Sequence, residues 1–210
     1  MTPRAKKNLH ESAFHLRGMR NATHFEDLEI AFAAFVNAAR NVTNVLQKEF
    51  KTHEKYRALF NDWYGDGGTT PKAGSKGHQM KSDPLCKFFV ELRNSIGKEG
   101  INGFACNTHI QELNTGTDLI DRPLNSSFVI TGAGAYYLVE QGTGKEDLIP
   151  ARTKARMTTE IFLTNPNPPT MHLGQKLEKN DVISLSEKYI AYLTELVEEW
   201  TEIMNKPDAP

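Results

Sequence analysis

The clearest pattern in the sequence is an apolar stripe between residues 25 and 46. Its apolar positions follow one another in steps of three and four: Phe25, Leu28, Phe32, Phe35, Ala39, Val42 and Leu46. Such a stripe is typical of a helix that turns one face toward the core of a bundle. Thr23 and Glu26 form a capping-box pair, so we expect the helix to begin there.

The other side of this predicted helix carries small residues. Ala31, Ala34 and Ala38 leave room for a second helix to approach closely. That neighbour belongs either to the same chain or to a second protomer, and the sequence leaves both alternatives open.

Three further stretches have the spacing of amphipathic helices. The first spans residues 6–19. The second begins at Asp83, with Pro84 at the first helical position, where its missing N–H costs nothing, and it should end at Gly97 or Gly100. The third begins after Asp181 and continues to residue 204.

The remaining segments are shorter or less regular. Residues 54–63 predict a short helical piece, and a flexible loop is expected at about 65–80 because Gly, Ser and Thr are frequent there. Residues 102–124 have no firm period and are predicted as loop. Residues 127–140 and 157–163 are rich in β-branched and aromatic residues and predict two or three strands of a small antiparallel sheet.

Together these elements predict a mainly α fold with four long helices. The length of 210 residues suits a single domain. The four-helix bundle would comprise about residues 5–100 and 181–205, and a β-containing insertion would occupy about 125–165, before the last helix.

Composition indicates the cellular compartment of the protein and the classes of partner that it can attract. No apolar run reaches the roughly 18 residues needed to cross a bilayer, and polar residues interrupt the N-terminus where a signal peptide needs an apolar stretch. The two cysteines, Cys86 and Cys106, are not in a C-x-x-C pair and favour a reduced, cytoplasmic compartment. A net charge of −1 gives no general attraction to nucleic acid or membranes.

Two segments resemble a metal-binding motif and a cofactor-binding motif, but neither has the residue spacing that the motif requires. His10 and His15 are five residues apart, whereas two ligands on one helical face require a spacing of four. Gly132 and Gly134 lack the third glycine of a dinucleotide-binding turn and lie in a strand-like context. We therefore predict neither a metal site nor a cofactor.

Arg93 and Asn94 are the strongest functional candidates. Arg93 lies four residues after Phe89 and three before Ile96, so it borders the apolar stripe of its helix. It should be partly buried and need a carboxylate or carbonyl partner. On one interpretation this arginine only ties its helix to a neighbour, and on the other it belongs to a binding site.

Three short segments carry a family resemblance. They are Ala33-Ala-Phe-Val-Asn-Ala-Ala-Arg-Asn-Val-Thr43, Asp83-Pro-Leu85 and Leu92-Arg-Asn-Ser-Ile-Gly-Lys-Glu-Gly100. In this combination the chain resembles the HEPN superfamily of helical-bundle, RNA-associated proteins. The resemblance covers about residues 8–101, is supported by the predicted helix at 181–204, and implies a HEPN-like four-helix bundle.

In ribonucleases of that superfamily, an Arg followed after four to six residues by a His acts on RNA at a dimer cleft without a metal. The resemblance implies that Arg93 and Asn94 begin this motif, while Lys98 stands where the His is most often found. An ordinary Lys, with a pKa of about 10.4, stays charged near neutral pH. Lys98 can therefore hold a phosphate but is a poor general base.

The predicted function is that of a non-catalytic HEPN-like protein, as a homodimer. Arg93, Asn94 and Lys98 would bind RNA or another phosphate-bearing or acidic ligand, and Arg40 would join them if its helix packs beside theirs. One alternative is a metal-independent endoribonuclease completed by Lys98 or a His from elsewhere. Another is a protein–protein interaction module with no nucleic-acid role, whose strand region binds an unknown partner.

Overall fold

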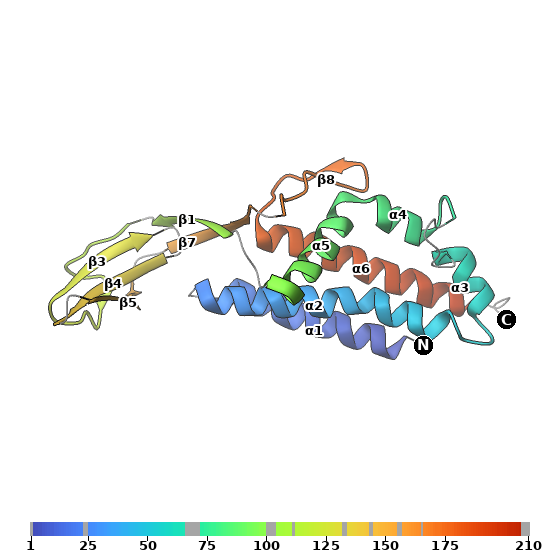
Figure 1. Ribbon diagram of the computed structural model, residues 1–210, viewed down its shortest axis with the longest axis horizontal. Helices are drawn as coiled ribbons and strands as arrows, with labels where there is room; N and C mark the ends of the chain where they lie inside the picture. The colour runs from blue at the N-terminus through green and yellow to red at the C-terminus, as the bar shows by residue number, and fades with distance from the viewer. Residues whose placement is uncertain are drawn as a thin grey trace.

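The molecule consists of a helical bundle with a β arm that projects from one end (Figure 1). The computed structural model describes residues 2–22, 25–65, 72–99, 104–110, 112–131, 134–142, 145–154, 157–164 and 166–206. The predicted mainly α fold class is confirmed. No helix in this described part of the chain is both long and apolar enough to cross a membrane.

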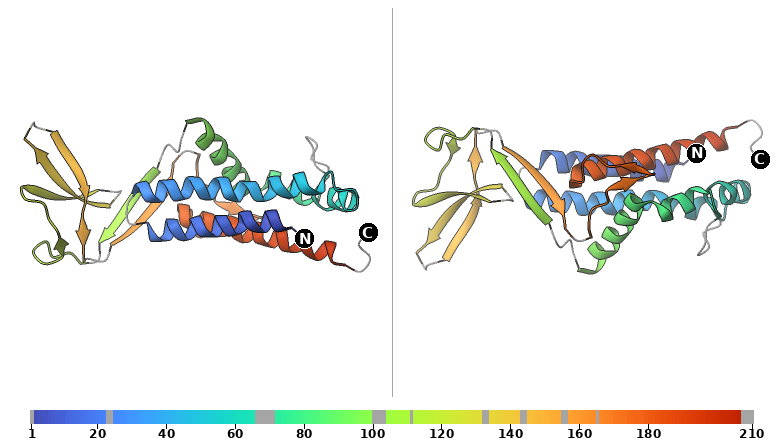
Figure 2. Two further views of the ribbon diagram at one scale, coloured as in Figure 1. Left: turned by 90° about the horizontal axis from the view of Figure 1, so that it is seen from below. Right: turned by 90° about the horizontal axis from the view of Figure 1, so that it is seen from above.

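Three long helices run side by side along the bundle (Figure 2). They are α1 (Pro3–Asn21), α2 (Phe25–Phe50) and α6 (Val182–Met204). Helix α1 is antiparallel to α6, because Thr2 Oγ1 lies 3.3 Å from Thr201 Oγ1 at one end and Arg20 pairs with Glu187 at the other. These helices confirm three of the predicted stretches, although Thr23, the expected cap of α2, lies outside the described residues.

Helix α5 crosses the bundle obliquely, and two short helices precede it along the chain (Figure 1). The three helices are α3 (Arg57–Tyr64), α4 (Lys76–Ser82) and α5 (Pro84–Glu99). The predicted caps of α5 and α6 are confirmed. The Cys86 N–H donates to Asp83 Oδ1, and the Ser184 N–H donates to Asp181 Oδ1, each at 2.9 Å.

One large hydrophobic core joins α1, α2, α5 and α6. The predicted stripe of α2 is buried from Leu28 to Leu46, and Phe25 is partly buried. The ring of Phe89 in α5 stacks on Tyr189 in α6, with centroids 4.2 Å apart. Aromatic pairs of this kind stabilise packing beyond the area that they bury, so this pair helps to fix α5 against α6.

Ala31, one of the small residues on the second face of α2, packs against a helix of the same chain. A Cβ atom placed on Gly18 of α1 would lie 3.5 Å from the Cβ of Ala31, so the two helices meet there at short range. Of the two alternatives for a neighbouring helix, the structure therefore assigns α1 of the same chain at this position.

Helix α4 occupies part of the predicted flexible loop, so that prediction is wrong for residues 76–80. Ser75 caps the helix by accepting a hydrogen bond from the His78 N–H at 3.3 Å. Gly77 permits close packing, because a Cβ there would lie 2.5 Å from the carbonyl oxygen of Tyr64. A helix of seven residues is too short for a periodic apolar signal. Residues 66–71 of the predicted loop lie outside the described part.

The β arm begins inside residues 102–124, where the loop prediction is wrong for 104–110 and 119–120 and is confirmed for 112–118 and 121–124. Strand β1 (Phe104–Ile110) pairs antiparallel with β7 (Met157–Leu163), which is far away along the chain. No local pattern marks such a long-range pair. The ring of Phe104 meets that of Phe25 edge-on, with centroids 5.3 Å apart, and this contact anchors the arm to the bundle.

The outer part of the arm is a small antiparallel sheet backed by a second strand pair. The sheet has the order β3 (Ser126–Thr131), β4 (Gly134–Gln141) and β5 (Lys145–Pro150), and the pair is β2 (Leu119–Ile120) with β6 (Arg152–Thr153). The predicted strands at 127–140 and 157–163 are confirmed. The predicted bounds of the insertion, 125–165, are too narrow because β1 and β2 precede them.

A final hairpin returns the chain to the bundle. It consists of β8 (Met171–His172) and β9 (Gln175–Lys176), and it lies beside the start of α5 (Figure 1). Leu173 and Gly174 form its turn, with φ angles of 49° and 78°. Glycine adopts such a left-handed conformation readily, whereas a leucine needs support from its surroundings.

Candidate functional site

The structure places Arg93 and Asn94 on the exposed surface of α5, so the prediction that Arg93 is partly buried is wrong. The buried stripe of α5 reaches Leu92, and Ile96 is only partly buried. The last turns of α5 project from the bundle (Figure 2), and the side chains at positions 93 and 94 are exposed. Lys98 belongs to the last turn of α5, and its side chain lies outside the described part.

Arg93 has no ionic or hydrogen-bonding partner among the described residues. Arg20 provides a contrast, because its Nε and Nη2 both donate to Glu187 Oε1, at 3.1 and 2.7 Å. The interpretation of Arg93 as a tie between helices therefore lacks the contact that it requires.

Arg40 lies elsewhere, in the wall of a cavity of about 280 Å³ between α2, α3, α4 and α5. We call it the Arg40 cavity; its lining includes Arg40, Gln47, Tyr64, Met80, Lys81, Cys86, Lys87, Val90 and Glu91. Helices α2 and α5 do pack together, as the grouping of Arg40 with Arg93 required. However, the α5 residues that face Arg40 come from the first half of the helix, and Arg93 and Asn94 do not line the cavity. The structure therefore divides the predicted cluster into two places.

The inner wall of the Arg40 cavity combines polar and apolar groups. Gln47 Nε2 donates a hydrogen bond to Tyr64 Oη at 2.9 Å, and that hydroxyl lies 3.7 Å from the sulfur of Met80. Burial raises the pKa of Tyr64, which stays neutral. Burial also raises the pKa of the Cys86 thiol, and the neighbouring Asp83 carboxylate raises it further. Because the thiolate is the reactive form of cysteine, Cys86 is not poised as a nucleophile.

Two buried tyrosines of α6 have hydroxyl groups that find no hydrogen-bond partner in the described structure, namely Tyr189 and Tyr192. Burial raises the pKa of both. Three residues of the Arg40 cavity, Arg40, Tyr64 and Cys86, lie close enough to Tyr189 to affect its ionisation. Buried polar groups are normally satisfied by protein, water or a ligand, so this region has unused hydrogen-bonding capacity.

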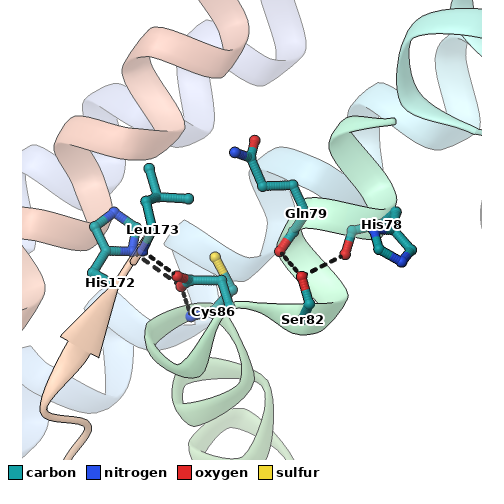
Figure 3. A network of polar contacts seen from close by, with 7 residues as sticks. His78, Gln79, Ser82, Cys86, His172 and Leu173 are labelled. Carbon is teal, nitrogen blue, oxygen red and sulfur yellow. Dashed lines mark hydrogen bonds and ion pairs between the residues drawn. The ribbon is translucent and has the colours of Figure 1, made fainter. Parts of the chain in front are cut away.

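A polar network joins α5 to the β8–β9 hairpin, and Figure 3 shows Cys86 of the helix near His172 and Leu173 of the hairpin. Asp83 is the residue with which all three form hydrogen bonds. Its carboxylate accepts hydrogen bonds from the N–H of Cys86 at 2.9 Å, the N–H of Leu173 at 2.7 Å and Nδ1 of His172 at 3.0 Å. Burial would raise the pKa of Asp83, but the hydrogen bonds from His172, Leu173 and Cys86 lower it to about 2. The sequence marks Asp83 as a helix cap, whereas its bonds to the distant hairpin carry no sequence signal.

No three His, Cys, Asp or Glu side chains of the described residues lie close enough together to hold a metal ion. Arg93 on the surface and Arg40 in its cavity are both among the described arginines that have no carboxylate within ion-pair distance, whereas Arg20 and Arg152 each have one. Comparison of the chain with protein-family models, curated proteins and solved structures gave no significant match.

Proposed function

We propose that the chain is a non-catalytic HEPN-like protein that binds RNA or another phosphate-bearing or acidic ligand at a surface formed by Arg93, Asn94 and Lys98. The observation that carries this proposal is the exposure of Arg93 with no partner among the described residues. A guanidinium group keeps five N–H donors in a planar fork that fits a phosphate or carboxylate in a bidentate manner. A homodimer and a cytoplasmic location are further parts of the proposal.

The charge of the protein shapes the kind of binding expected at this surface. The net charge of −1 gives no general attraction to a polyanion, so affinity must come from a few local contacts. Charge-assisted hydrogen bonds to phosphate are roughly twice as strong as neutral ones, and exposed pairs weaken as salt increases. Binding should therefore be modest, sensitive to salt and dependent on Arg93.

The test is the affinity of a fluorescently labelled single-stranded RNA, measured by anisotropy in low salt. Arg93→Ala should weaken binding about tenfold, as expected for the loss of a charged hydrogen-bond donor. Arg57→Ala is the matched control, because Arg57 is also an exposed arginine with no carboxylate partner among the described residues, and it should leave the affinity unchanged. Equal affinities for Arg93→Ala and the unaltered protein would contradict the proposal and favour the interaction module.

The same protein and RNA, incubated with a chelator, separate binding from catalysis. We expect the RNA to remain intact, because no imidazole follows Arg93 at the spacing of the superfamily motif. Cleavage that disappears in Arg93→Ala would replace the proposal with the metal-independent endoribonuclease.

A further inference from the structure

The Arg40 cavity has the size and apolar surface of a small-molecule site. Its volume of about 280 Å³ is about twice that of a 150 Å³ protein cavity that accommodates benzene. Met80, Cys86 and Val90 and the ring of Tyr64 contribute apolar surface from three different helices. An apolar body of about two fused rings would be enclosed there on several sides.

The electrostatic character of the cavity is positive. Arg40, Lys81 and Lys87 line it together with a single carboxylate, Glu91. Neither Glu91 nor any other described carboxylate lies within ion-pair distance of Arg40. The hydrogen bond that Arg40 does make goes from Nη1 to the neutral Oγ1 of Thr43, so its charge is not compensated by that partner.

Because Arg40 is half-buried, the lack of a carboxylate partner has an energetic cost. A charge taken partly out of water costs free energy unless another charge accompanies it. An anion entering the cavity would supply that charge and could accept two parallel N–H bonds from the guanidinium.

We propose that the Arg40 cavity binds a small organic anion. Its ring-sized apolar body would lie against Met80, Cys86 and Val90, and its carboxylate, sulfonate or phosphate would bind the guanidinium of Arg40. This site is separate from the exposed surface of Arg93, which does not line the cavity, so each can fail without the other.

A pair of probes of equal size tests the proposal without any substitution. We would titrate the full chain with 2-naphthoate and with 2-naphthalenemethanol, which differ mainly in charge, and follow binding by calorimetry and ligand-observed NMR. Naphthoate should bind at least about tenfold more tightly, since the added interaction is a charged bidentate one. If the alcohol binds equally well, or if neither probe binds at millimolar concentration, the proposal is wrong.

Two substitutions then assign the interaction to the cavity. Arg40→Gln keeps a polar side chain without the charge, so it should reduce the affinity for naphthoate to that for the alcohol. Val90→Trp should fill the cavity and abolish binding of both probes, whereas Arg93→Ala should change neither. Thermal unfolding of each variant checks that the bundle is intact. Unchanged naphthoate binding in folded Arg40→Gln would overturn the assignment, as would full loss in Arg93→Ala.

Discussion

The bundle buries whole aromatic side chains such as Trp200 and Tyr189, whereas the core cluster of the distal arm, residues 112–154, consists of Ala135, Tyr137 and Ala151. The bundle core connects all four long helices, but the distal arm is a three-stranded sheet backed by a single short strand pair. Stability follows the apolar area removed from water. The two regions should therefore unfold with very different free energies, and the arm should open locally while the bundle stays folded.

The boundary between the two regions lies within the β1–β7 ladder. Phe104, Ile161 and Leu163 belong to the bundle core, so the base of the ladder shares the stability of the helices. Farther out, every residue of β5 is exposed, including Leu148 and Ile149. The base of the ladder thus lies in the bundle core, whereas β5 is exposed along its whole length.

The largest effect should come from Trp200 in the bundle. Its ring centroid lies 5.1 Å from that of Phe50, 5.0 Å from that of Phe60 and 5.2 Å from that of Trp63. Trp200→Ala should lower the free energy of unfolding by about 3–5 kcal/mol in urea denaturation. Trp200→Phe should lose clearly less, because it keeps an aromatic ring and removes a buried indole N–H that has no partner in the described structure. A loss below about 1 kcal/mol for the alanine variant would contradict a single tightly packed core.

A smaller effect, with a signature in pH, is expected at Asp83. Its pKa falls from the ordinary 3.8 to about 2 in the folded state, which corresponds to about 2 kcal/mol of stabilisation. A lowered carboxyl pKa stabilises the folded state above the unfolded pKa, so this contribution is complete above pH 3.8 and is lost as the pH falls toward 2.

Urea denaturation of Asp83→Asn at several pH values checks this expectation. The variant should be less stable than the unaltered protein at neutral pH, and the difference should shrink as the medium becomes acidic. Asp62→Asn is a suitable control, because Asp62 is an exposed carboxylate that pairs with Lys72 on the surface. A difference that stays constant down to pH 2 would show that the charge of Asp83 is not the stabilising feature.

The smallest effect on the bundle should come from Tyr137 in the arm. Tyr137 is buried in the arm core, and its hydroxyl donates to the carbonyl oxygen of Ile120 at 2.9 Å, which connects β4 to β2. Tyr137→Ala should speed hydrogen exchange in β3, β4 and β5 but change the unfolding free energy of the bundle by less than about 0.5 kcal/mol. Tyr137→Phe should show a milder form of the same local effect. A loss in the bundle as large as that of Trp200→Ala would mean that the two regions unfold together.

The parts of the fold that could be predicted are those with local and repeated signals. The stripe of α2 spans several turns, and Asp83 and Asp181 each stand directly before an apolar helical pattern. Helix α4 has a cap at Ser75 but only seven residues, so it offers no such repeat. Strand β1 forms by pairing with β7, and no local sequence pattern indicates a pairing between segments so far apart in the chain.

The candidate site, too, could be predicted from the sequence only in part. Arg40 and Arg93 could be named from sequence, but helical spacing alone did not reveal that the end of α5 projects from the bundle and leaves Arg93 exposed. The cavity beside Arg40 could not be predicted either, because Tyr64 and Met80 reach it from α3 and α4. Residue type identified the charges, whereas the surroundings of each charge depend on tertiary packing.

The bonds of Asp83 also set an order of events during synthesis of the chain. Leu173, which donates to this carboxylate, leaves the ribosome 90 residues after Asp83 itself. Tyr189, the stacking partner of Phe89, follows still later. Until then the nascent helices α1 to α5 expose the apolar faces that α6 will cover, a state prone to association with other chains. The apolar core of the bundle is therefore complete only after α6 has been made.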